Sequence, residues 1–261
     1  MKNILDYSTR ESRPQPDTFH EHTGHYLDPE KSKVHDMINQ IEDYAKENKI
    51  KLNYKKTKLI VFNPGLKRDF FPRFSFNESE LQVVDESKLL GVIIRNDLSW
   101  SSHTSDIIKR GNKKLWCLKR LKKFGASTQE LLDVYNKQVG SLLEFAAPVW
   151  HPSLTGGDKR RIERVQKSAF SIILGRNFKS YRRALSSLKM DSLFVRREKL
   201  CKKFALKSLK HPKFKNWFKL NSKPLSTREE ISKFCEIRSR TKRYERSPIN
   251  YLIKMLNNHY K

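Results

Sequence analysis

The stretch RIERVQKSAFSIILG, residues 161–175, repeats apolar side chains at helical spacing. The side chains that fall on one face are Ile162, Val165, Ala169, Ile172 and Ile173. Basic residues lie between them, and Gly175 follows the last apolar residue, where a glycine commonly ends a helix. The stretch therefore predicts a helix with an apolar face that packs against other helices and a basic face that does not.

The same periodicity predicts further helices on both sides. They are expected over residues 32–47, from about 102 to 125, from 127 to 148 and from 192 to 209. Ser127 and Glu130 have the spacing of a capping box, which begins a helix. Pro148 would end that helix, because proline cannot continue the hydrogen-bond ladder.

The inward residues of these helices follow from the same spacing. In the helix from 127 to 148 they are Leu132, Tyr135, Val139, Leu142 and Ala146. In the helix from 192 to 209 the apolar stripe is Leu200, Phe204 and Ser208. Trp150 is expected to be a core aromatic rather than a base-stacking platform.

Short apolar runs between the first two helices predict strands. They cover residues 58–62, 70–76, 81–84 and the segment LLGVII, in which Gly91 would lie inside a short buried strand. Asn96 and Asp97 form a turn signal after it. The order is helix, small antiparallel sheet and helical bundle, which predicts the α+β class.

Composition points to a polyanionic partner. The 261 residues hold 55 Lys and Arg against 28 Asp and Glu, a formal net charge of +27, and only 37% are apolar. Neutralising phosphates releases condensed counterions, so such an excess favours RNA, DNA or an RNA–DNA hybrid. An anionic membrane surface is the weaker alternative. The apolar runs are too short to span a bilayer, so no membrane insertion is expected.

The N-terminal residues lack the apolar core of a secretory signal. The three cysteines, Cys117, Cys201 and Cys235, follow no metal-binding or disulfide spacing. Both observations predict an intracellular protein of the nucleus or cytoplasm that is not secreted. The segment HEHTGH does not match a zinc motif, so no metal site is predicted.

Several segments, taken in order, resemble one family. NYKKT (residues 53–57) leads into a strand, and KLLGV (88–92) precedes Leu98, Trp100 and His103. LLEFAAPVW (142–150), RIERVQKSAFSIILG (161–175), the segment 180–209 and TKRYERSPINYLIKMLNN (241–258) follow. This series resembles the C-terminal part of the reverse transcriptase of non-LTR retrotransposons of the jockey and CR1 type, over residues 32–258.

The resemblance implies a palm end, a thumb and basic helices after it. Lys56 would stand beside the incoming nucleotide and assist the departing pyrophosphate, with Asn53 and Lys55 also at the nucleic acid. LLGVII would be the hairpin that contacts the primer end, where Gly91 permits close approach of a backbone. Trp100 and His103 would lock the start of the thumb.

The carboxylates of polymerase chemistry do not accompany these segments. The full-length family holds two Mg²⁺ ions with aspartates, but no Asp-Asp pair occurs in this sequence. We therefore expect no cofactor in this chain and no polymerisation by it alone. It is interpreted as a catalytically incomplete fragment of an RNA-directed DNA polymerase. The alternative is a non-catalytic basic nucleic-acid-binding protein derived from a retroelement.

Basic residues concentrate between residues 159 and 215, which hold 19 Lys and Arg against three acids. The predicted phosphate contacts on the two helices are Arg160, Arg161, Arg164, Lys167, Arg196, Arg197, Lys199, Lys202, Lys203 and Lys207. We expect them to lie largely away from the apolar stripes. Such contacts position a nucleic acid without reading its sequence.

The predicted organisation has five parts. Residues 1–31 form a disordered or non-native N-terminus and 32–101 the palm end; 102–150 are thumb-like helices, 151–210 a basic helical region and 211–261 a tail with a terminal helix. The sequence does not indicate an oligomeric state.

Overall fold

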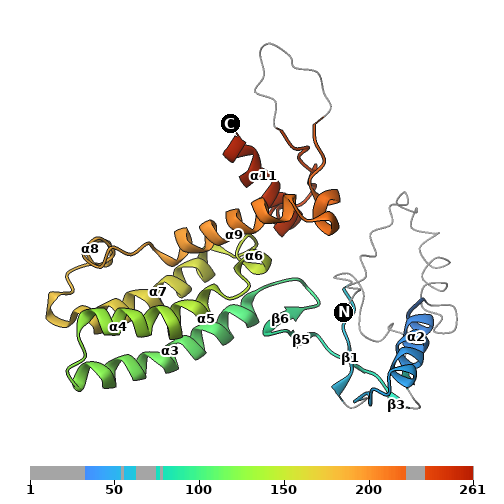
Figure 1. Cartoon of the computed structure of the whole chain (residues 1–261), viewed down its shortest axis with the longest axis horizontal. Helices are drawn as coiled ribbons and strands as arrows, with labels where there is room; N and C mark the ends of the chain where they lie inside the picture. Colours follow the sequence, from blue (N-terminus) through green and yellow to red (C-terminus); the bar gives the residue numbers. More distant parts are fainter. Residues whose placement is uncertain (1–32, 54–55, 63–74, 77–78, 222–232, 261) are drawn as a thin grey trace, which may run out of the picture. The chain divides into compact units, whose positions relative to one another are not determined.

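The fold comes from a computed structural model that describes residues 33–53, 56–62, 75–76, 79–221 and 233–260 (Figure 1). The chain divides into two compact units, Met1–Ser87 and Lys88–Lys261. Helices dominate and the strands are short, so the class is α+β. Within the described part, no helix combines the length and hydropathy needed to cross a membrane.

The first unit contains one long helix and two strand pairs. Helix α2 (Lys33–Glu47) matches the predicted helix over 32–47. Strand β1 (Lys58–Leu59) pairs in parallel with β4 (Gln82–Val83), and β2 (Ser75–Phe76) pairs antiparallel with β3 (Ser79–Glu80). The expected antiparallel sheet was therefore wrong for β1 and β4. Ile38 and Leu81 are buried together in this unit, with Leu52 and Leu59 packed against them.

A hairpin joins β5 (Glu86–Leu89) to β6 (Val92–Arg95). Leu90 and Gly91 form its turn, with φ angles of 48° and 88°. The placement of Gly91 inside a strand was therefore wrong, since it occupies a left-handed turn position that favours glycine. A Cβ atom at Gly91 would also lie 3.1 Å from the Phe145 ring. The Phe145 side chain therefore occupies the space in which a nucleic-acid backbone was expected to approach Gly91.

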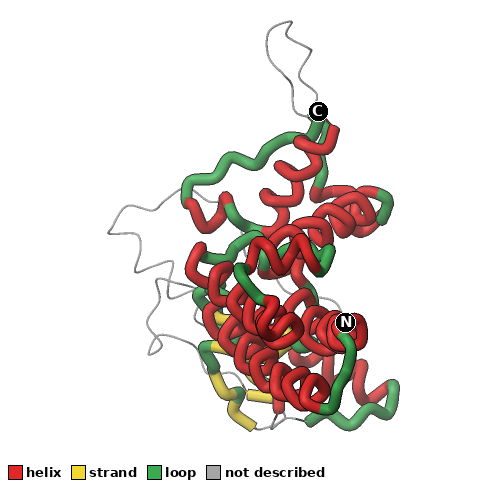
Figure 2. Tube along the Cα trace, turned by 90° about the vertical axis from the view of Figure 1, so that its left-hand side faces the viewer, coloured by secondary structure: helices red, strands yellow, loops and turns green. Residues whose placement is uncertain are grey.

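The second unit continues as packed helices. They are α3 (Ser101–Lys123), α4 (Thr128–Val134), the π-helical η5 (Tyr135–Gly140), α5 (Ser141–Glu144), α6 (Ala147–Trp150), α7 (Gly156–Leu174), α8 (Tyr181–Ser187), α9 (Leu193–Leu209), α10 (Lys242–Glu245) and α11 (Pro248–Tyr260). Short 3₁₀ segments, η6 (Gly175–Asn177) and η7 (Pro212–Trp217), follow α7 and α9. Helix α3 packs along α7, α7 contacts α9, and α9 contacts α11 (Figures 1 and 2).

The main core lies between α3, α4–α5, α7 and the start of α9. The predicted stripe of α7 is confirmed, because Ile162, Val165, Ala169 and Ile173 are buried there. Trp150 is fully buried, as predicted for a core aromatic. A second core forms around Cys201, Ala205, Phe218, Phe234, Leu252, Ile253 and Leu256.

His103 links the β5–β6 hairpin to the main core. Its side chain is buried, its Nδ1 accepts a hydrogen bond from the Ile93 N–H at 3.4 Å, and its ring centroid lies 5.4 Å from that of Trp150. Trp100 meets the same imidazole edge-on at 6.1 Å. Trp100 and His103 thus pack together at the start of α3.

The helix beginning at Ser127 has the predicted start and a different end. Ser127 Oγ accepts from the Glu130 N–H, and the Glu130 carboxylate accepts from the Ser127 N–H at 2.8 Å, a complete capping box. The helical run ends at Glu144, because Ala146 has a positive φ of 50°. Pro148 lies in the first turn of α6, where a missing N–H is tolerated, so it does not end the preceding helix.

The stripe predicted for α9 was correct at Ser208 and wrong at Leu200 and Phe204. The residues that α9 buries are Leu193, Arg197, Cys201, Ala205 and Ser208. Leu200 and Phe204 are only half-buried. The reason is that α9 packs against different elements along its length, against α5, α6 and α7 near its start and against α11 and η7 further along.

Candidate nucleic-acid interface

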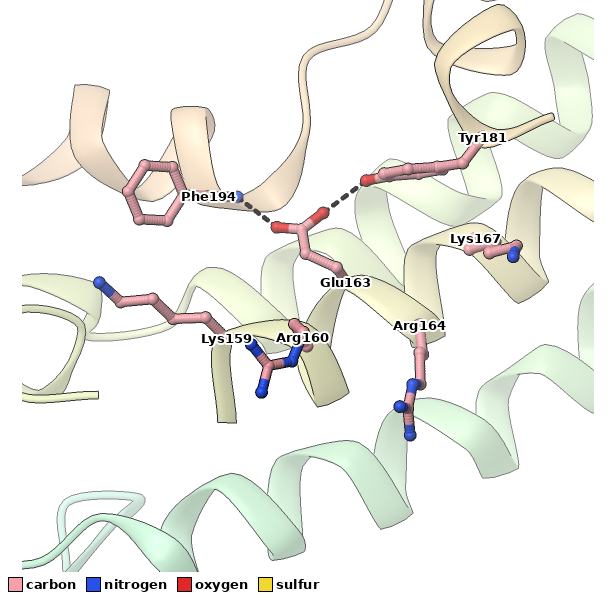
Figure 3. A pocket seen from close by; sticks show the side chains of 7 residues that line it. All are labelled: Lys159, Arg160, Glu163, Arg164, Lys167, Tyr181 and Phe194. Atoms are coloured by element: carbon pink, nitrogen blue, oxygen red, sulfur yellow. Dashed lines mark hydrogen bonds between the residues drawn. The ribbon is translucent and has the colours of Figure 1, made fainter. Parts of the chain in front are cut away.

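A shallow basic hollow lies where α7 faces α8 and the start of α9 (Figure 3). It has a volume of about 390 Å³. The residues that line it are Lys159, Arg160, Glu163, Arg164, Lys167, Tyr181 and Phe194. Four of these side chains are cationic and one is a carboxylate, and Arg160, Arg164 and Lys167 are exposed to solvent.

Glu163, the carboxylate in this lining, is already engaged by the fold. It accepts a hydrogen bond from the Phe194 N–H at 2.6 Å and another from the Tyr181 hydroxyl at 2.5 Å (Figure 3). Because Phe194 lies in the first turn of α9, the carboxylate also complements the positive end of that helix. Its charge therefore serves the packing of α7, α8 and α9.

Tyr181 and Lys159 complete the walls. Burial raises the pKa of Tyr181 and its bond to Glu163 raises it further, so the hydroxyl remains a donor. The Lys159 Nζ lies 5.0 Å from the centre of the Phe194 ring, and partial burial lowers the pKa of this amine. The hollow is therefore lined by exposed cations of α7 together with the Phe194 ring and the Tyr181 phenol.

Three other predicted cations form contacts within the chain, namely Arg161 on α7 and Arg196 and Arg197 at the start of α9. Arg161 pairs with Asp158 at 3.2 Å and reaches Ser105 Oγ on α3 at 3.1 Å. Arg196 forms an ion pair with Glu144 through two nitrogens and donates to Asn136 Oδ1 at 3.0 Å, and the bond to Glu144 outweighs burial to raise its pKa. Arg196 therefore fastens α9 to α5 and η5, contrary to its predicted place on an open basic face.

Arg197 contradicts the prediction most clearly, because its side chain is 0% exposed. Its Nε donates to His151 Nδ1 at 3.1 Å, and its guanidinium carbon lies 5.7 Å from the centre of the Trp150 ring. Its nearest carboxylate oxygen is Glu163 Oε1, 3.7 Å from Nη2. Arg197 is a buried structural cation and cannot meet a phosphate on the surface.

The remaining predicted cations of α9 are exposed. Lys199 pairs with Asp191 at 2.5 Å, and both side chains remain largely in water. Lys202, Lys203 and Lys207 are exposed along the rest of the helix. None of these four lysines belongs to the lining of the hollow.

The residues predicted from the NYKKT segment belong to the first unit. Asn53 accepts the Lys56 N–H with its carbonyl at 3.1 Å and with its side-chain oxygen at 3.2 Å, and its carbonyl also accepts from Thr57 Oγ1. Lys56 is exposed, and Lys55 lies outside the described residues. Asn53 thus shapes the turn that leads to β1, while Gly91 lies in the hairpin of the second unit.

Sequence reasoning missed Lys159, Glu163, Tyr181 and Phe194 as members of the site. Lys159 begins the run KRR and could have been included from that signal. The other three depend on tertiary packing of α8 and α9 against α7, which has no local signature.

Comparisons with known proteins leave the family undetermined. A scan against protein-family models, a search of curated proteins and a search of solved structures each found no match. Among the described residues, no group of three or more His, Cys, Asp and Glu side chains is placed to hold a metal ion. The resemblance to reverse transcriptases and the cofactor expectation therefore stay predictions.

Proposed function

We propose that this chain binds nucleic acid through phosphate contacts on α7, as the thumb-like, non-catalytic part of a reverse-transcriptase-related protein. The observation that carries the proposal is the hollow of Figure 3, where Arg160, Arg164 and Lys167 stay exposed while Glu163 is engaged by the fold. The family assignment rests on the sequence resemblance alone.

The chemistry of the hollow suits phosphate. Two arginines and a lysine on one helix offer several donors to anionic oxygens, and guanidinium groups bind phosphates in a bidentate manner. The net positive lining attracts a polyanion before contact, and each neutralised phosphate releases counterions. These contacts read no base edges, so binding is independent of sequence.

Nucleic acid is favoured over a small anion or a lipid surface by how far the charge extends. Exposed lysines continue along α9 at Lys202, Lys203 and Lys207, beyond the hollow. A polymer of phosphates can neutralise cations over such a length, whereas a single small anion cannot. Among the described residues of α7 and α9, Val195 is the one large apolar residue that is exposed. These helices therefore offer little apolar surface that a lipid membrane could bury.

The test is charge reversal on α7. In the variant Arg160→Glu/Arg164→Glu/Lys167→Glu, affinity for a mixed-sequence duplex should fall at least about tenfold in moderate salt, because phosphate contacts become repulsive. The slope of log affinity against log salt should become shallower by about 0.9 per lost contact. Fluorescence anisotropy over a salt series measures both quantities.

A control of equal charge change separates the hollow from general electrostatics. Arg240, Lys242 and Arg243 are exposed near α10, outside the lining of the hollow. Reversing these three should reduce affinity much less than reversing the α7 set. Equal losses in the two variants, or a flat salt response of the native chain, would show that α7 forms no binding surface.

A further inference from the structure

The outward face of α3 carries a second arrangement of charges and aromatic rings. Ile107, Gly111, Leu115 and Leu118 form the buried side of this helix. At about 100° per residue, the opposite side is centred on Arg120. The exposed charged and aromatic residues on that side include Lys109, Lys113, Trp116, Arg120, Lys123 and, at the end of the helix, Phe124.

Trp116 and Phe124 are unusually exposed for their size, at 65% and 77%. They stand four residues to either side of Arg120, so the three side chains follow one another along the helix. The Arg120 guanidinium carbon lies 5.3 Å from the Trp116 ring centre and 5.5 Å from that of Phe124. One arginine therefore spaces two aromatic rings whose outer faces remain in water.

The exposed charged residues on this side of α3 are cationic. The described acid of α3 is Asp106, which pairs with Arg110 at 3.3 Å. Lys109, Lys113 and Lys123 are exposed on the same side as the rings. A surface of aromatic faces among exposed lysines is complementary to a ligand that is both planar and anionic.

We propose that this face of α3 is a stacking site for single-stranded nucleic acid, with bases on Trp116 and Phe124 and phosphates at the lysines. A free base offers its π-face to an aromatic side chain whatever its identity, whereas the bases of a duplex are stacked on one another. The inference rests on the proposed function for its polyanionic ligand and adds a preference for single strands.

An acidic peptide is the competing occupant, since it would also meet the lysines. It would not need the planar faces of Trp116 and Phe124 for stacking. The two ligands are separated by a probe that keeps the phosphates and removes the bases, namely an abasic single strand of the same length as oligo(dT).

The experiment uses the full chain and three probes: oligo(dT), the abasic strand and a duplex. The native chain should bind oligo(dT) more tightly than the abasic strand. In Trp116→Ala/Phe124→Ala, affinity for oligo(dT) should fall by about tenfold or more, since one stacked base contributes a factor of about five to a hundred. Affinity for the abasic strand and for the duplex should stay within about twofold.

Two further variants serve as controls for the stacking site. Trp116→Phe retains a stacking ring and should keep most of the oligo(dT) affinity. Tyr244 is exposed on α10, so Tyr244→Ala removes an aromatic residue elsewhere and should leave all three affinities unchanged. Circular dichroism should show native helix content in every variant, because the substituted side chains lie in solvent.

The outcomes separate this inference from the proposed function. Duplex binding that depends on α7, together with equal binding of oligo(dT) to the native chain and to Trp116→Ala/Phe124→Ala, would overturn the stacking site alone. Equal losses for the abasic strand would also overturn it. A native chain that binds none of the three probes would overturn both proposals.

Discussion

Helices α7 and α9 have similarly basic sequences, but the fold uses their cations differently. On α7, Arg160, Arg164 and Lys167 remain exposed around the hollow. On α9, Arg196 is held by Glu144 and Arg197 is buried against His151 and Trp150. A count of charges along the sequence treats the two helices as equal, whereas only one presents its arginines to solvent.

The difference lies in which side chains the neighbouring elements cover, since α7 also contacts several of them. Helix α9 contacts α5, α6, α7 and α11, so part of its circumference that the sequence marks as polar is covered. Arg197 then becomes part of the interior, where an arginine needs a partner for each group it places there. His151 Nδ1, the Trp150 ring and the nearby Glu163 carboxylate supply only part of this need.

The largest expected effect follows from this burial. Replacing Arg197 with alanine removes a wholly buried side chain from between His151, Trp150 and Glu163 and leaves a cavity. The free energy of unfolding should fall by about 3 kcal/mol or more, in the range seen for breaking a buried charge pair or creating a cavity. Urea denaturation followed by circular dichroism measures the change.

Two matched variants sharpen that comparison. Arg164→Ala on α7 should change the free energy of unfolding by less than about 0.5 kcal/mol, since its side chain is exposed. Arg197→Met keeps the volume and removes the charge, so it should cost less than Arg197→Ala. Equal stability of Arg197→Ala and Arg164→Ala would contradict the burial of Arg197.

A pH dependence of intermediate size should come from His151. Burial, together with the nearby Arg197 and Lys159 charges, lowers the pKa of His151 from 6.5 to about 3. Between these two values the unfolded chain binds a proton that the folded chain does not. The contribution of neutral His151 to the free energy of unfolding is therefore fully present above about pH 6.5. It is lost as the pH falls, by at most about 1.4 kcal/mol per pH unit.

The measurement is the free energy of unfolding at pH 6.5 and pH 5, above the range where most carboxylates titrate. His151→Gln retains an oxygen that can accept from Arg197 Nε and removes the titrating group. Between pH 6.5 and pH 5, the free energy of unfolding of His151→Gln should therefore fall by less than that of the native chain, with a difference of up to about 2 kcal/mol. Burial also lowers the pKa of His103, which adds a residual loss of the same sign to both proteins.

The sequence predicted helices well where apolar residues mark the buried face. The α7 stripe and the capping box at Ser127 were correct, because periodicity and local hydrogen bonding determine them. Ala146 and Pro148 were misjudged, since the helix ends where the chain adopts a left-handed φ that no local pattern announced. On α9, Leu200 and Phe204 were predicted to face inward, whereas tertiary contacts that no local window contains bury Cys201 and Ala205.

The candidate site was predicted only in part for the same reason. Arg160, Arg164 and Lys167 were identified because they alternate with a clear apolar stripe. Arg196 and Arg197 were predicted to lie on the surface because their helix is strongly basic. In the structure Arg196 pairs with Glu144, and Arg197 contacts His151 and Trp150. Arginine in particular invites this error, because its donors fit both phosphates and partners within the protein.

The smallest expected effect concerns Lys56, an exposed cation outside both helices. Its backbone N–H, rather than its side chain, forms the bonds to Asn53 that shape the turn before β1. Lys56→Ala should therefore change the free energy of unfolding by less than about 0.5 kcal/mol. Asn53→Ala removes the side-chain acceptor of that N–H and should cost more. If Lys56→Ala were the more destabilising of the two in thermal melts, the lysine side chain would be paired in the folded chain, and the comparison between exposed and structural cations would have to include it among the latter.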